Sequence, residues 1–185
     1  MRFGLRLAAF PLAFALAACA SGTPSVGTGP TASPGSTGAT TPRSPSADQS
    51  ALDQRLRDAA WTDDVPAAER LIAQGADVNA KDATQQSAYL IATSEGHLDL
   101  LRLALRHGAR VDDKDSWNGT GLIRAAERGH AGVVGELLRA GIERDHVNRI
   151  GYQAVHEAVW LGADTAAYAT TVRVLAAGGV RLTDR

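Results

Sequence analysis

The chain has 185 residues and a formal net charge of −1, so it lacks the basic surface that a general nucleic-acid binder needs. Aromatic residues make up only 5% of the chain, and alanine and leucine are abundant, which favours helices over a β-sandwich. The single cysteine excludes an intramolecular disulfide bond.

The first segment, residues 1–18, has the features of a secretory signal. Arg2 and Arg6 lead into an apolar run, 7–18, that is too short to span a bilayer as a mature helix. The run ends in Leu16-Ala17-Ala18-Cys19, which resembles a bacterial lipoprotein box. The resemblance implies that the signal peptide is removed before Cys19 and that this cysteine is lipidated, with acyl chains such as palmitate. An ordinary signal peptide with an incidental cysteine is the alternative.

The residues after Cys19 indicate which membrane holds the protein and how the folded part is tethered to it. Ala20 stands where an aspartate would retain the protein at the inner membrane, by resemblance to enterobacterial sorting. The resemblance implies the outer membrane if the organism has one, and otherwise the outer face of the cytoplasmic membrane. From Ala20 to Ala47, all but two residues are Gly, Ser, Thr, Pro or Ala. Such a composition cannot bury enough apolar surface to fold, so residues 19–47 are predicted to form a disordered, lipid-anchored tether.

A period of 33 residues runs through the remainder of the chain, 48–185. It is visible in apolar pairs followed by glycine and in glycine–histidine pairs: Leu71-Ile72 with Gly75, Ala104-Leu105 with Gly108, Leu137-Leu138 with Gly141, and Gly96-His97 with Gly129-His130. This register resembles the ankyrin repeat. The resemblance implies an all-α solenoid of about four helix-turn-helix repeats with short hairpin turns, over about 50–81, 82–114, 115–147 and 148–182.

The fourth repeat departs from this register. The spacing from Gly141 to Gly178 is 37 residues, so about four residues are inserted around 164–169, most easily in the loop between its two helices. The Thr-Pro-Leu-His motif that opens the family's first helix keeps its histidine only at His156, so we expect a weaker turn network in the middle repeats.

We expect no catalytic, metal or cofactor site. His97 and His130 are explained by the repeat, no serine lies in a nucleophile elbow, and no phosphate-binding loop is present. The segment 113–117 lacks the spacing and closing glutamate of a calcium loop. The sequence Asn118-Gly119-Thr120 matches a glycosylation sequon, but it coincides with a hairpin turn of the repeat, which is the interpretation we favour. We therefore expect neither a small-molecule substrate nor nucleic acid as a partner.

The resemblance places partner binding at the hairpin tips and along the first helix of each repeat. Aromatic and arginine side chains are the usual energetic anchors of protein interfaces. The candidate partner-binding residues at these positions are Trp61, Thr84, Gln86, Glu95, Trp117, Glu127, Arg128, Arg149, Tyr152 and Trp160. For Trp61 and Trp160, which share one repeat position in the outer repeats, shielding of the ends of the stack is an equal alternative.

The sequence therefore predicts a membrane-anchored extracytoplasmic module that binds a protein partner and does not catalyse a reaction. A second hypothesis comes from the end of the chain. Val172, Val174 and Leu175 have no following repeat to cover them, although terminal repeats usually carry a polar outer face. On that hypothesis the protein is a structural envelope component that self-associates through an uncapped C-terminal repeat.

Overall fold

The computed structural model describes residues 46–162 and 165–182, which all belong to one compact unit, Pro42–Arg185. Cys19, the signal peptide and most of the tether lie outside the described residues. In the described part of the chain there are eight helices and no strands: α1 (Ala47–Trp61), α2 (Val65–Ala73), α3 (Ala88–Glu95), α4 (Leu98–Arg106), α5 (Gly121–Glu127), α6 (Ala131–Arg139), α7 (Ala154–Trp160) and α8 (Ala166–Ala177).

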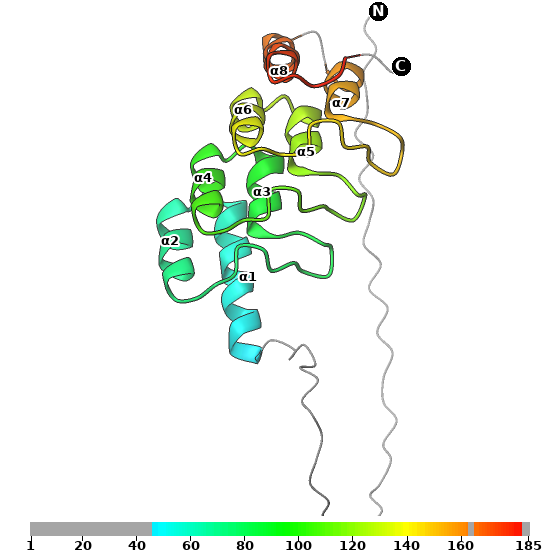
Figure 1. The fold of residues 1–185 in the computed structure, drawn as a ribbon. Coiled ribbons are helices and arrows are strands. Elements are labelled where there is room, and N and C mark those ends of the chain that lie inside the picture. Colours follow the sequence, from blue (N-terminus) through cyan, green and yellow to red (C-terminus); the bar gives the residue numbers. More distant parts are fainter. Residues whose placement is uncertain (1–45, 163–164, 183–185) are drawn as a thin grey trace, which may run out of the picture. The chain divides into compact units, whose positions relative to one another are not determined.

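The helices form four antiparallel pairs, which confirms the predicted all-α repeat architecture. Figure 1 shows the first helices, α1, α3, α5 and α7, stacked in one row and the second helices in another. The hairpins that join successive repeats extend to one side of the first-helix row. The first helix begins at Ala47, one residue before the expected boundary, because the Ser46 side chain accepts a hydrogen bond from the Gln49 N–H.

Each second helix of the first three repeats ends in the same way. Gly75, at φ +100°, follows α2, and the N–H groups of Gly75 and Ala76 donate to Ile72 and Leu71 carbonyls. This is the Schellman arrangement, which needs a left-handed residue that glycine adopts at little cost. The same bonds recur after α4 and α6, which explains the 33-residue glycine spacing.

The core is continuous through the stack because alanines let first helices approach closely while leucines and valines fill the space between repeats. Ala60, Ala92 and Ala125 are fully buried in the first-helix row. The apolar pairs fill the other row, where Leu101, Val134 and Leu137 are fully buried. Each repeat buries its apolar face only against its neighbours, so the stacking of repeats stabilises the fold.

The C-terminal repeat differs from the sequence-based expectation in two ways. Only part of the inserted stretch lies in the loop, because α8 already begins at Ala166 and is longer than the other second helices. The expectation that Val172, Val174 and Leu175 lie uncovered was wrong. Leu175 is fully buried and both valines pack against the core, because these residues lie on the face of α8 that contacts α6 and α7.

Candidate partner-binding groove

The hairpin tips are built on one polar residue that recurs every 33 positions: Asp82, Asp115 and Asn148. Its side-chain oxygen accepts hydrogen bonds from the backbone N–H groups two and four residues further on. For Asp115 the donors are Trp117 and Gly119, both at 2.8 Å, and for Asn148 they are Ile150 at 3.1 Å and Tyr152 at 2.9 Å. The oxygen thus holds the tip backbone in a tight turn.

This turn directs large side chains into solvent. Trp117 is 62% exposed and Ile150 is 59% exposed, at equivalent positions of the third and fourth tips. Asn118 adopts φ +60° in the same turn, and its side-chain amide donates to the Val147 carbonyl at 3.1 Å. The glycosylation sequon is therefore a structural turn, with Thr120 completely buried.

The third and fourth tips are hydrogen-bonded to one another. The Arg149 N–H donates to the Trp117 carbonyl at 3.0 Å, and the His146 Nε2 lies 2.8 Å from the Asn118 carbonyl. These bonds fix the spacing between Trp117 and the fourth tip, so the exposed apolar groups are held at defined positions.

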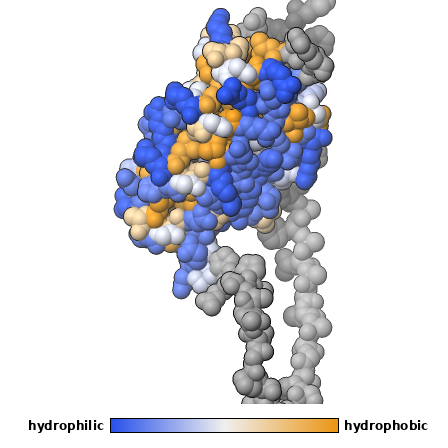
Figure 2. All heavy atoms as spheres, viewed as in Figure 1, coloured by the Kyte–Doolittle hydropathy of each residue, from blue (hydrophilic) through white to orange (hydrophobic). Residues whose placement is uncertain are grey.

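Between these two tips and the helices α5 and α7 lies a groove of about 510 Å³, which we name the tip groove. We call its apolar lining, from both tips and the end of α7, the walls, and its polar lining, from α5, α7 and Asn148, the floor. It is lined by Trp117, Arg124, Glu127, Asn148, Ile150, Tyr152, Glu157, Trp160 and Leu161. Figure 2 shows that the face seen there is largely hydrophilic, with hydrophobic residues gathered in a band over the middle repeats and towards the C-terminal helices.

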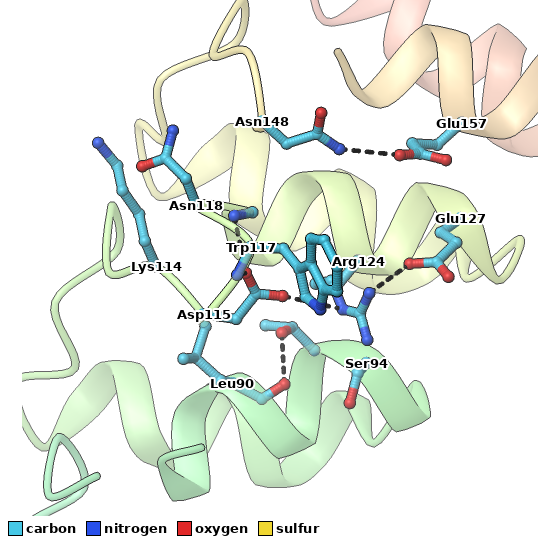
Figure 3. A network of polar contacts seen from close by, with 12 residues as sticks. Leu90, Ser94, Lys114, Asp115, Trp117, Asn118, Arg124, Glu127, Asn148 and Glu157 are labelled. Carbon is cyan, nitrogen blue, oxygen red and sulfur yellow. Dashed lines mark hydrogen bonds and ion pairs between the residues drawn. The ribbon is translucent and has the colours of Figure 1, made fainter. Parts of the chain in front are cut away.

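The charged groups on the floor are unequally paired (Figure 3). The Arg124 guanidinium donates to Glu127 at 2.7 Å and lies 3.4 Å from the buried carboxylate of Asp115. Glu157 is only 6% exposed, and its Oε1 accepts a hydrogen bond from the Asn148 amide at 2.9 Å. Burial raises the pKa of the Glu157 carboxyl, and the nearby Glu127 carboxylate raises it further, while the Asn148 amide opposes this shift.

The structure brings four of the ten candidate residues together in the tip groove: Trp117, Glu127, Tyr152 and Trp160. Trp160 is 76% exposed and so covers little of the end of the stack, whereas Trp61 is 49% exposed and about half covered. Trp61 lies at the end of α1, two repeats away from the groove along the chain.

The other candidates lie elsewhere on the surface. Thr84 donates its hydroxyl hydrogen to Asp82 at 2.7 Å and, with Gln86, forms the second repeat's tip. Glu95 and Arg128 form an ion pair with each other across adjacent repeats. Arg149 is exposed on the fourth tip but does not line the groove.

Of the other five lining residues, Ile150 is a hairpin-tip position, where partner binding was expected, and sequence reasoning missed the remaining four: Arg124, Asn148, Glu157 and Leu161. Arg124 and Glu157 occupy one repeat position, three residues before Glu127 and Trp160, and so lie one helical turn earlier on the same face. Extending the candidate set by one turn would have found both. Asn148 was not recognised as the equivalent of Asp82 and Asp115 because the fourth tip has an asparagine where the two preceding tips have an aspartate.

Two further observations concern other kinds of site. In the described ranges, 46–162 and 165–182, no three or more His, Cys, Asp or Glu side chains are grouped so that they could hold a metal ion. Within those same ranges, no helix has the length and hydropathy needed to cross a membrane.

Residues 56–148, about half of the chain, match the family model of ankyrin repeats in three copies. The structure is similar to the crystal structure of an ankyrin repeat domain from Acinetobacter baumannii, with a TM-score of 0.65 and 43% sequence identity. The match covers 68% of this chain and 64% of that one, so this chain spans less than two thirds of its relative's length. No curated protein matches the sequence.

The chain belongs to the ankyrin-repeat family, and ankyrin repeats indicate a protein–protein interaction module. Such folds are typically non-catalytic scaffolds. The family match ends at residue 148, so most of the fourth tip and both helices of the fourth repeat lie beyond it. The tip groove therefore combines residues of the matched repeats with residues of the additional fourth repeat.

Proposed function

We propose that this protein is an extracytoplasmic interaction module, anchored to a membrane through lipidated Cys19, that binds a protein partner in the tip groove without catalysis. The observation that carries the proposal is the groove itself, where three aromatic side chains surround a polar floor. Large exposed apolar groups gathered at one place are uncommon on a surface that meets only water. Tryptophan and tyrosine are also the side chains most enriched among the energetic anchors of interfaces.

The anchor and the tether complete this proposal. A lipoprotein cysteine carries more than one acyl chain, which meets the need of two lipid signals for stable anchoring. The composition of residues 20–47 suits a flexible spacer between the lipid and the repeats. These parts of the proposal rest on the sequence alone.

Affinity capture from solubilised envelope, with the full chain as bait, tests partner binding. Replacing Trp117 and Tyr152 together by alanine is expected to reduce capture by at least tenfold while leaving the helical circular dichroism unchanged. Trp61→Ala with Gln86→Ala is the matched control, since both residues lie outside the groove, and it should capture normally. Equal capture by the unchanged chain and by both variants would contradict the placement of the binding site in the tip groove.

Membrane fractionation tests the anchor separately. The full chain should sediment with membranes, and the Cys19→Ala variant should appear in the soluble fraction. A Cys19→Ala variant that stays with the membranes would contradict lipidation at this residue without bearing on the groove.

Self-association remains a second candidate because one apolar surface on α7 is uncovered. Val159 is 65% exposed, whereas Thr93 and Ala126, its equivalents in the two preceding repeats, are fully buried by the next repeat. Size-exclusion chromatography of the full-length Cys19→Ala chain over a range of concentrations decides this. Growth in mass that is abolished by Val159→Lys would favour self-association, and a constant monomer would exclude it.

A further inference from the structure

Glu157 is a largely buried carboxyl group in which only one oxygen has a protein partner. Its Oε1 accepts from Asn148, but Oε2 has no hydrogen-bond or ion-pair partner among the described residues. The one guanidinium on the groove floor is that of Arg124, and it is engaged by Glu127 and Asp115. Buried carboxylates normally acquire a cationic or hydrogen-bonding partner, because an unpaired buried charge is costly.

The charges of the floor do not balance. Glu127 and Glu157 provide two carboxyl groups on the floor against the single Arg124, whose guanidinium is also shared with the buried Asp115 behind it. The walls beside them include the side chains of Trp117, Tyr152 and Trp160. Aromatic rings attract cations electrostatically, and a tryptophan ring does so most strongly. The acidic floor and the aromatic walls therefore both favour a cationic ligand group.

We infer that the tip groove takes an arginine or lysine side chain of the partner protein, which donates hydrogen bonds to Glu157 and lies between the aromatic walls. This inference rests on the proposed function, because it names the chemistry of the segment that the groove binds. The exposed Ile150 and Leu161 at the rim contact the apolar neighbours of that basic residue.

A neutral or apolar side chain fits this groove less well. It would cover the free oxygen of Glu157 and remove its remaining access to water without supplying a donor, which leaves a buried polar group unsatisfied. An acidic side chain would add a third carboxylate to the two that line the floor. A basic side chain instead forms a charge-assisted hydrogen bond, and an arginine can present two N–H groups to the carboxylate.

Nuclear magnetic resonance of the full chain tests the inference with defined peptides. The probe is acetyl-Leu-Arg-Leu-amide, compared with the same peptide carrying citrulline, which has the shape of arginine but no charge. The arginine peptide should shift the indole N–H signals of Trp117 and Trp160 and leave Trp61 unmoved. The citrulline peptide should bind at least tenfold more weakly.

Two variants assign the effect to the carboxylate. Glu157→Gln should remove the preference for arginine over citrulline, whereas Glu69→Gln, an exposed residue of α2, should keep it. Equal shifts of Trp117 and Trp160 by both peptides would overturn the charge recognition but leave the groove as a peptide site. If the arginine peptide at millimolar concentration shifts neither tryptophan signal, the inferred recognition of a basic side chain is also wrong. The capture experiment with the Trp117 and Tyr152 variants tests the proposed function separately.

Discussion

At Glu157, the proposed binding role opposes the stability of the fold. Its folded-state pKa is raised by burial and by Glu127, with Arg124, His156 and the Asn148 amide acting in the other direction. A carboxyl group with a raised folded pKa favours folding when protonated. It therefore destabilises the fold progressively as pH rises from the unfolded pKa, about 4.3, through the folded value.

The first prediction follows from this sign. Glu157→Gln should raise the melting temperature at pH 7, by about 2 to 4 °C for each kcal/mol gained in a chain of this size. The gain should shrink as the pH falls towards 4, where the wild-type carboxyl group is protonated. Calorimetry of the wild type and the variant between pH 4 and pH 8 measures this difference in melting temperature. A difference that does not change with pH would show that the Glu157 charge is not the cause.

Asp115 supports a second prediction, about the tips. Asp115→Ala leaves the N–H groups of Trp117 and Gly119 without their acceptor, which should cost about 1 to 3 kcal/mol of unfolding free energy. Asp115→Asn keeps an acceptor oxygen, as Asn148 does in the next tip, and should cost clearly less. Urea denaturation compares the two variants, and equal losses would refute the role given to this oxygen.

At the level of helices, the third prediction concerns the left-handed residue between α3 and α4. Gly96 has φ +81°, and a Cβ atom there would lie 2.7 Å from Nδ1 of the His130 ring. Gly108 has nearly the same φ, +82°, with nothing within 4 Å of its Cβ position. Both alanine variants should lose about 1 kcal/mol from the backbone conformation, and Gly96→Ala should lose more because the His130 ring must move. Equal losses in thermal or urea unfolding would argue against the packing of His130 on this turn.

The helices and their register were predictable because each of their determinants is local and repeats at a fixed spacing. Gly75, Gly108 and Gly141 end second helices through bonds within a single turn. The groove was predictable only in part. The exposure of Trp117 follows from its own hairpin, whereas the burial of Glu157 depends on how two repeats stack and on the tip that holds Asn148. The burial of Leu175, by contrast, does follow the repeat: Leu175 stands four residues before the left-handed Gly179, as Leu137 stands four residues before Gly141.

For the whole repeat domain, the two ends of the stack have different chemistry. Each outer first helix exposes a tryptophan at the same repeat position, Trp61 and Trp160, but α1 otherwise exposes Gln54, Arg55 and Asp58, whereas α7 exposes Val159. A polar end and an apolar end do not complement one another, so head-to-tail filaments are not expected. Any self-association would instead pair two like apolar ends in a closed dimer.

The fourth prediction concerns the distribution of stability along the stack. The helices α3 and α5 contact neighbouring first helices on both sides, whereas α8 belongs to the last repeat. Since repeat stability comes from contacts between neighbours, amide hydrogen exchange should be slowest in α3 and α5 and faster in α8. Slowest exchange in α8 would contradict this account of the stack.

The most direct test of partner binding in the tip groove is hydrogen exchange of the full chain with and without its captured partner. We expect added protection in 115–119 and 148–152, the two tips that form the groove, and at the end of α7 around Trp160. The tip of the second repeat, 82–86, should be unaffected. Protection confined to the second helices α2, α4 and α6, with the tips unchanged, would contradict the account.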